Sequence, residues 1–167
     1  PGIKVANLDK VLKKWILYPR TQKDKTVSLS GVAFGGLDHP FFDWLILNIK
    51  DQKSDLPATP LEIRRSPIKN GEKVYLIGVP YSDRGSSQNV YEGKITQRKG
   101  DRFRYSISPA VDIRGFSGAP ILDSKGYVVG VMTVWFDPNM SGNNYLEAGG
   151  EDIASIYNKI NPPKVQK

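Results

Sequence analysis

A serine between two glycines is the feature of this sequence with the clearest chemical meaning. Ser117 stands in the segment Gly115-Phe-Ser-Gly-Ala-Pro120. A serine hydroxyl on a tight bend can act as a nucleophile in acyl transfer when a nearby base takes its proton. Glycine also lets the backbone N–H groups of a bend turn inward, where they can stabilise an oxyanion. An ordinary glycine–serine loop is the alternative interpretation.

The residues around Ser117 favour the nucleophile. A strand-like run, Arg104–Ser108, precedes the bend. After the bend come Ile121-Leu122, a turn at Asp123–Gly126 and a second apolar run, Tyr127–Phe136. Apolar runs separated by Gly, Asp and Ser are typical of a β-hairpin. The sequence therefore predicts a hydroxyl group on a bend that is backed by two strands.

Few other residues can take part in chemistry with this serine. The chain has one histidine, His39, and no cysteine. A thiolate nucleophile, a disulfide and a cysteine metal site are thereby excluded. Carboxylates are the metal ligands that remain, and the spacing of Asp123, Asp137 and Glu147 matches no calcium loop. We expect no metal and no cofactor.

The net charge of +7 and the pI near 9.5 raise the alternative of a nucleic-acid-binding β-barrel. Basic residues concentrate in the segment 94–104, where aromatic residues stand between them and could stack on bases. We expect the aromatic side chains to pack in a core and the charges to face water instead. The residues concerned are Lys94, Arg98, Lys99, Arg102 and Arg104, with Tyr91, Phe103 and Tyr105.

The pattern along the chain predicts an all-β protein with a short helix at its C-terminal end. Apolar runs of strand length recur between Gly, Pro, Asn and Asp residues. A helix is expected over 151–160, with acidic residues in its first turn, and a turn or two over 5–12. Strands are expected near 14–18, 26–34, 44–49, 73–79, 90–96, 102–108, 119–122, 127–136 and 144–147.

A segment rich in prolines and polar residues, 51–70, has the composition of a connection between domains. We therefore expect two domains, residues 1–60 and residues 61–167. No stretch approaches the roughly 18 apolar residues of a membrane span, and Pro1-Gly-Ile-Lys4 does not open a signal peptide. The absence of cysteine fits a reducing cytoplasm and also an exported bacterial protein, so the localisation stays open.

Several segments together resemble the chymotrypsin-fold serine proteases, and the trypsin-like HtrA-type peptidases above all. Gly115–Phe136 is similar to the nucleophile region of that family. Asp43-Trp-Leu-Ile-Leu-Asn-Ile49 resembles the strand that opens with the catalytic aspartate, and His39-Pro-Phe-Phe42 resembles the loop before it. Glu72–Pro80 resembles the first strand of the second barrel, and 144–160 the closing strand and helix. The resemblance implies a double β-barrel, with the N-terminal barrel incomplete in this chain.

The resemblance also implies site residues and a polypeptide substrate. Ser117 would attack the peptide carbonyl, the N–H groups of Gly115 and Ser117 would hold the oxyanion, and Asp43 would orient a histidine. Trp135 falls where many relatives carry glycine, which favours a small or apolar substrate side chain over a basic one. The primary specificity pocket would be lined by Val111, Asp112, Ile113 and Arg114, and substrate would pair with an edge strand at Thr133, Val134 and Trp135.

The histidine departs from the family pattern. The family counterpart of His39 lies on a surface loop, and the catalytic histidine is expected tens of residues before Asp43. Val5–Lys10 resembles the segment that comes directly after that histidine in the family, so either Lys4 stands in its place or the natural residues end there and other residues are joined to them. Three interpretations remain open: an active protease whose histidine comes from a missing N-terminal segment or a partner chain, an inactive pseudoprotease that binds peptides, or an unusual base, His39 or Lys4.

Overall fold

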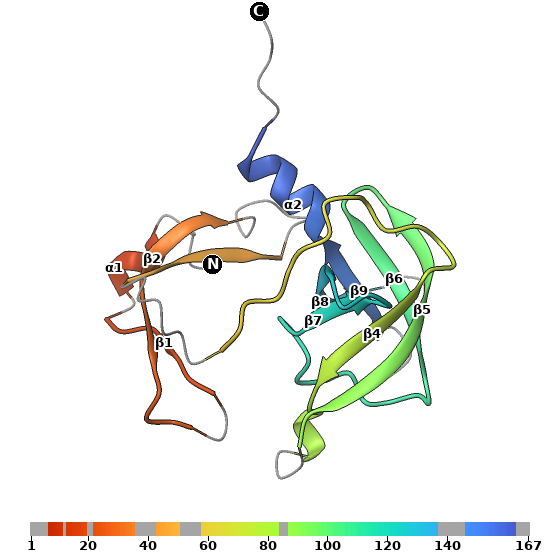
Figure 1. The fold of residues 1–167 in the computed structure, drawn as a ribbon, viewed down its shortest axis with the longest axis horizontal. Helices are drawn as coiled ribbons and strands as arrows, with labels where there is room; N and C mark the ends of the chain where they lie inside the picture. The colour runs from red at the N-terminus through yellow and green to blue at the C-terminus, as the bar shows by residue number, and fades with distance from the viewer. Residues whose placement is uncertain are drawn as a thin grey trace, which may run out of the picture. The chain divides into compact units, whose positions relative to one another are not determined.

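The computed structural model describes residues 7–11, 13–19, 22–35, 43–50, 58–83, 87–136 and 146–162. The chain divides into two compact units, Pro1–Pro60 and Leu61–Lys167. Strands dominate both units (Figure 1), which confirms the expected all-β class. Residues 36–42, which contain His39, and residues 1–6, which contain Lys4, lie outside the described part of the chain.

The N-terminal unit contains one three-stranded antiparallel sheet in the order β1-β2-β3. Its elements are the helix α1 (Leu8–Val11) and the strands β1 (Ile16–Leu17), β2 (Val27–Gly35) and β3 (Leu45–Ile49). None of the described residues of this unit is buried, and Leu17 and Phe34 are 54% and 50% exposed. A single sheet with half-exposed apolar residues is an incomplete barrel, as the sequence indicated.

The C-terminal unit is a closed six-stranded barrel in the order β4-β5-β6-β9-β8-β7. Neighbouring strands are antiparallel, and the pairing of β4 with β7 closes the barrel. A short 3-10 helix, η2 (Tyr81–Asp83), follows β4. The strands are β4 (Lys73–Gly78), β5 (Asn89–Lys99), β6 (Arg102–Ser108), β7 (Pro120–Asp123), β8 (Val128–Phe136) and β9 (Leu146–Asp152).

Alternating side chains of these strands form the core. In β4, Val74 and Leu76 are buried, whereas Lys73 faces water. In β6, Phe103 and Tyr105 are buried in the same alternation, so these two aromatic rings are core residues, as we expected. Successive side chains of a strand point to opposite faces, and this places every second residue inside the barrel. The alternative in which these rings stack on bases is therefore not supported.

The helix α2 (Ile153–Ile160) begins two residues later than the sequence predicted. Glu151 and Asp152 are the last residues of β9, and no acidic residue lies in the first turn of α2. Two arginines of the β5–β6 hairpin pair with these acids, with an Arg102 Nε–Glu151 Oε1 distance of 3.0 Å and an Arg98 Nη2–Asp152 Oδ2 distance of 3.1 Å. The ion pairs and the ladders to β6 and β8 hold this segment in the sheet.

None of the helices in the described ranges is long and apolar enough to cross a membrane. Within the same residues, no three His, Cys, Asp or Glu side chains gather in a way that could hold a metal ion.

Candidate active site

The loop between β6 and β7 carries Ser117 on the surface of the barrel. Ser117 is exposed and stands between Gly115, with a φ of 97°, and Gly118, with a φ of 86°. Side chains with a Cβ rarely adopt such positive φ values, so this conformation of the loop requires glycine on both sides of the serine.

The backbone of Tyr81 fixes the peptide group that precedes Gly115. The N–H of Tyr81 donates to the carbonyl oxygen of Arg114 over 2.8 Å. In a trans peptide the C=O and the N–H point in opposite directions, so the N–H of Gly115 points away from Tyr81. A Cβ at position 115 would lie 2.8 Å from the Tyr81 nitrogen, which leaves no room for a side chain.

Used and unused backbone donors alternate along the loop. The N–H groups of Phe116, Gly118 and Ala119 donate to backbone oxygens over 3.3, 2.9 and 2.8 Å. The N–H groups of Gly115 and Ser117 donate to none of the residues that the structure describes. The two unused donors belong to exposed residues on either side of a residue whose N–H is paired, so they are available to an external oxygen atom. Such donors can stabilise the oxyanion of an acyl-transfer reaction.

The side chain of Phe116 anchors the loop in the barrel. Phe116 is 1% exposed, and its ring meets the ring of Tyr91 edge to face, with centroids 5.4 Å apart and an interplanar angle of 87°. A Cβ on Gly78 of β4 would lie 2.7 Å from Phe116 Cδ1, so this glycine makes room for the ring. Burial of Phe116 turns its neighbour Ser117 outward.

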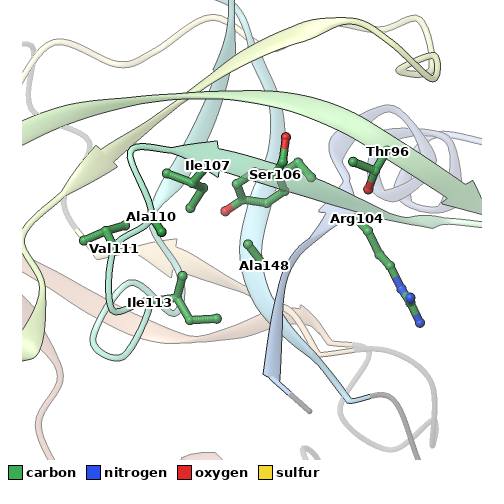
Figure 2. A pocket seen from close by; sticks show the side chains of 9 residues that line it. Thr96, Arg104, Ser106, Ile107, Ala110, Val111, Ile113 and Ala148 are labelled. Atoms are coloured by element: carbon green, nitrogen blue, oxygen red, sulfur yellow. The ribbon is translucent and has the colours of Figure 1, made fainter. Parts of the chain in front are cut away.

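A cavity of about 340 Å³ is lined in part by the segment that leads to Ser117 and in part by strands of the barrel (Figure 2). Val111 and Ile113 line it, whereas Asp112 and Arg114 are not among its lining residues. Arg114 Nε donates to both carboxylate oxygens of Asp112 over 2.8 and 2.9 Å, and these hydrogen bonds lower the pKa of Asp112 to about 2. The lining residues are Thr96, Arg104, Tyr105, Ser106, Ile107, Ala110, Val111, Ile113 and Ala148.

The strand β8 continues past the end of its pairing with β7. The pairing with β7 covers Val128–Val131, whereas the pairing with β9 reaches Phe136. Thr133 is buried, and Val134 and Trp135 pair through their backbones with Ala148 and Glu147. The side chains of Val134 and Trp135 lie outside the described part. Over the last residues of β8, the described strands provide a neighbour on one side.

The two residues that the sequence analysis favoured most stand in different units. Asp43 is exposed and stands two residues before the start of β3 in the N-terminal unit, and Ser117 lies in the C-terminal unit. The structure brings Ser117 together with Gly115, Val111 and Ile113 on one loop.

Tyr105, Thr96 and Ala148 were not expected at this site from the sequence. Alternation in β6 indicates that Tyr105 faces inward, but it does not show whether the ring fills the core or borders a cavity.

Comparison with known proteins identifies the family. The family model of the trypsin-like peptidase domain matches residues 13–131, a range that includes Asp43 and Ser117. The chain belongs to the trypsin-like peptidase family. The trypsin-like peptidase domain here keeps the C-terminal barrel with its serine loop, and its fold is that of the chymotrypsin-like proteases.

Solved structures agree with this trypsin-like peptidase fold at low sequence identity. The chain is similar to a Glu endopeptidase, with a TM-score of 0.66 and 19% identity over 92% of this chain and 73% of that one. For neuropsin of mouse brain the TM-score is 0.62, with 14% identity over 84% of this chain and 73% of that one. For an inactive form of Rv3671c from M. tuberculosis the TM-score is 0.55, with 18% identity over 97% of this chain and 77% of that one. A search of curated proteins gave no match.

Proposed function

We propose that this trypsin-like peptidase domain is the serine endopeptidase module of its protein and that Ser117 is the nucleophile. One observation carries the proposal: an exposed serine lies on a loop in which the N–H groups of Gly115 and Ser117 are unused by the described residues and their neighbours are paired. Two such donors serve a developing oxyanion, and an ordinary surface loop has no need of this alternation.

The reaction follows from these groups. Ser117 Oγ bonds to the carbonyl carbon of the scissile peptide while a general base takes the hydroxyl proton. The carbonyl oxygen becomes negative and accepts hydrogen bonds from the two available N–H groups. The C–N bond then breaks, the leaving amine takes the proton from the conjugate acid of the base, and an acyl ester remains on Ser117. Water attacks this ester by the same route and restores the serine.

Two surfaces of the barrel are suited to a polypeptide substrate. The extension of β8 beyond its pairing with β7 offers backbone groups on one side, where an extended peptide can add as a further strand. The cavity beside the serine loop can take one substrate side chain. The substrate in this proposal is therefore an extended polypeptide with a side chain next to the cleaved bond.

The proposal assigns the general base to a histidine outside this chain. His39 is the single histidine of the sequence, and it stands four residues before Asp43. We propose that a preceding segment or a partner chain supplies the base and completes the N-terminal sheet, in which no described residue is buried. Asp43 is the residue we assign to orient that histidine.

Labelling with a fluorophosphonate, read by intact mass, tests the nucleophile. We expect one label on the chain joined to its natural preceding segment. Ser117→Ala abolishes the label, and Ser124→Ala, at an exposed turn of the same barrel, keeps it. Label on Ser117→Ala or none on the extended wild type would overturn the proposal. Labelling of the chain alone would place the base within it, and His39→Ala and Lys4→Ala would then identify that base.

The single histidine also supports a second candidate, a pseudoprotease that holds peptides without cleaving them. This candidate predicts that the extended protein binds peptides along β8 and remains unlabelled.

The nucleic-acid alternative receives less support from the structure. Arg98 and Arg102 are engaged by buried carboxylates, and Phe103 and Tyr105 are buried. A gel shift with nucleic acid that weakens steeply with added salt would support nucleic-acid binding.

A further inference from the structure

Tyr105 is one of the residues that line the cavity beside the serine loop, and its buried hydroxyl group has no hydrogen-bond partner within the described part of the chain. The residue as a whole is 4% exposed. A buried hydroxyl without a partner costs free energy, and native proteins rarely leave one unsatisfied without a functional reason. A ligand group that reaches this hydroxyl from the cavity would provide the missing partner.

The walls of the cavity limit the kind of ligand. In Figure 2, Ile107, Ala110, Val111 and Ile113 gather at one end. The side chain of Arg104 extends away from this apolar end. Burying a charged group among apolar walls is costly unless an opposite charge lies close to it. Arg104 also lines the cavity but lies away from the apolar end, so it is this apolar end that suits a side chain with an apolar stem and an uncharged polar end.

The protonation state of Tyr105 supports the same choice. Burial raises the pKa of the Tyr105 hydroxyl well above its ordinary value of 10. The phenol therefore stays neutral at physiological pH and can donate one hydrogen bond to a carbonyl oxygen. A single neutral donor does not compensate the burial of a carboxylate, and it offers no negative charge to an ammonium group.

We propose that the cavity binds a substrate side chain that ends in an amide, as glutamine does, and that the Tyr105 hydroxyl determines this specificity. The inference rests on the proposed function, because it assigns the cavity to the residue next to the cleaved bond. The methylene groups of glutamine contact the apolar wall, and its carbonyl oxygen accepts the hydrogen bond from Tyr105. Methionine has nearly the same shape but leaves the hydroxyl unsatisfied. This assignment differs from the small or apolar side chain expected from Trp135.

A binding experiment tests the inference without any catalysis. The chain is prepared with tyrosine isotopically labelled at Cζ, and the resonance that Tyr105→Phe removes is assigned to Tyr105. We expect saturable shifts of this resonance with N-acetylglutamine amide and much smaller ones with N-acetylmethionine amide or the lysine analogue. No response to the glutamine amide, an equal response to the methionine amide or a stronger response to the glutamate analogue would overturn the inference.

Cleavage selectivity provides the second test, on the extended protein. Two peptides differ only in glutamine or methionine before the cleaved bond. The kcat/KM ratio is expected to favour glutamine by about tenfold or more, because the wrong side chain leaves a buried donor unpaired. Tyr105→Phe should remove this preference, and Tyr75→Phe, a tyrosine of β4 that is not among the lining residues, should keep it. A preference that survives Tyr105→Phe contradicts the inference.

The two proposals fail separately. An extended protein that resists the fluorophosphonate rejects the protease, and the Tyr105 resonance still decides on the amide site. A labelled Ser117 with a silent Tyr105 rejects the amide site alone.

Discussion

Gly115 determines the geometry of the serine loop for two separable reasons. Its φ of 97° lies where a Cβ is strained, and the backbone of Tyr81 occupies the space in which a Cβ would stand. Together these features direct the N–H of Gly115 away from Tyr81 and leave it available. Any side chain at this position must disturb the loop that presents Ser117.

Gly115→Ala is therefore expected to lower the free energy of unfolding by more than Gly126→Ala does. Gly126 has a φ of 86°, and a Cβ at that position would meet no heavy atom within 4 Å. Its substitution therefore measures the strain of φ alone, about 1–2 kcal/mol. The close contact with Tyr81 adds to this cost at position 115. Urea denaturation of both variants measures the difference, and equal losses would show that Tyr81 moves aside freely.

The sequence predicted the residues of the serine loop, but it did not predict which polar groups near the loop lack a hydrogen-bond partner. Ser117 and its two glycines were evident because their residue types and order carry the chemistry. The role of Tyr105 was not, because alternation in β6 predicts burial and says nothing of an unused hydroxyl. Whether the hydroxyl finds a hydrogen-bond partner depends on the residues of all neighbouring strands, and these strands come together only in the closed barrel.

At the scale of elements, Asp152 joins β9 to α2 and to the β5–β6 hairpin. Its Oδ1 accepts the N–H of Ala154 over 3.0 Å as the N-cap of α2, and its Oδ2 accepts from Arg98. Asp152 is 1% exposed, whereas the Arg98 side chain is 33% exposed and reaches water. One side chain thus performs two functions that substitution can separate.

Asp152→Ala should destabilise the protein by about 1 kcal/mol more than Asp152→Asn, because asparagine caps a helix as well as aspartate does. Both variants lose the charge that faces Arg98. Asp101→Asn serves as a control: its carboxylate pairs with Lys159 on the surface over 2.7 Å, and an exposed pair contributes less than about 1 kcal/mol. Thermal or urea unfolding measures all three, and equal stability of the two Asp152 variants would contradict the cap.

Strand positions were predictable from apolar runs, and the start of α2 was not. Apolar runs located β4, β6 and β8 to within a residue or two. Glu151 and Asp152 fit the first turn of a helix in composition, and the sequence therefore placed them there. Their partners, Arg102 and Arg98, are about fifty residues away in sequence, and local propensity does not include such contacts.

At the scale of the whole molecule, the two units differ in how much apolar surface they bury. The C-terminal barrel has a continuous core that includes Val74, Leu76 and Phe103. In the N-terminal unit, no described residue is buried. Stability follows buried apolar contacts, so the two units should open with different free energies.

Hydrogen exchange should resolve this difference. Backbone amides of β5 and β6 are expected to exchange more slowly than those of β2 and β3, by about 100-fold or more, since a few kcal/mol separate a packed core from an open sheet. Mass spectrometry on peptic fragments measures both. Addition of the natural preceding segment should slow exchange in β2 and β3 alone. Equal protection of the two sheets in the chain alone would contradict this account.

The loss of thermal stability at acidic pH should depend on Glu72. A hydrogen bond from Arg64, with Nη2 and Oε1 3.0 Å apart, lowers the pKa of Glu72 below its ordinary value of 4.5. A lowered pKa in the folded state stabilises the protein above the ordinary value, and this contribution is lost as the pH falls through the folded value. Glu72→Gln should therefore flatten the fall in Tm below about pH 4.5. An unchanged slope would show that other carboxylates dominate.

Family membership was within reach of the sequence because several motifs occur in the right order along one chain. The position of the general base was not, since the sequence holds one histidine and it precedes Asp43 by four residues. The incomplete N-terminal barrel was expected from the resemblance, whereas the order of the strands in the closed barrel is a property of the assembled strands and emerged only from the structure.

The residues that line the cavity determine where substitutions could change the selectivity for substrate side chains. Ala110, Val111 and Ile113 belong to the segment that also sets the position of Ser117, so substitutions there alter selectivity and reactivity together. Thr96 and Ala148 border the same cavity from β5 and β9. Laboratory evolution of this scaffold should therefore find its productive diversity on the two strands, where a changed side chain leaves the reactive hydroxyl in place.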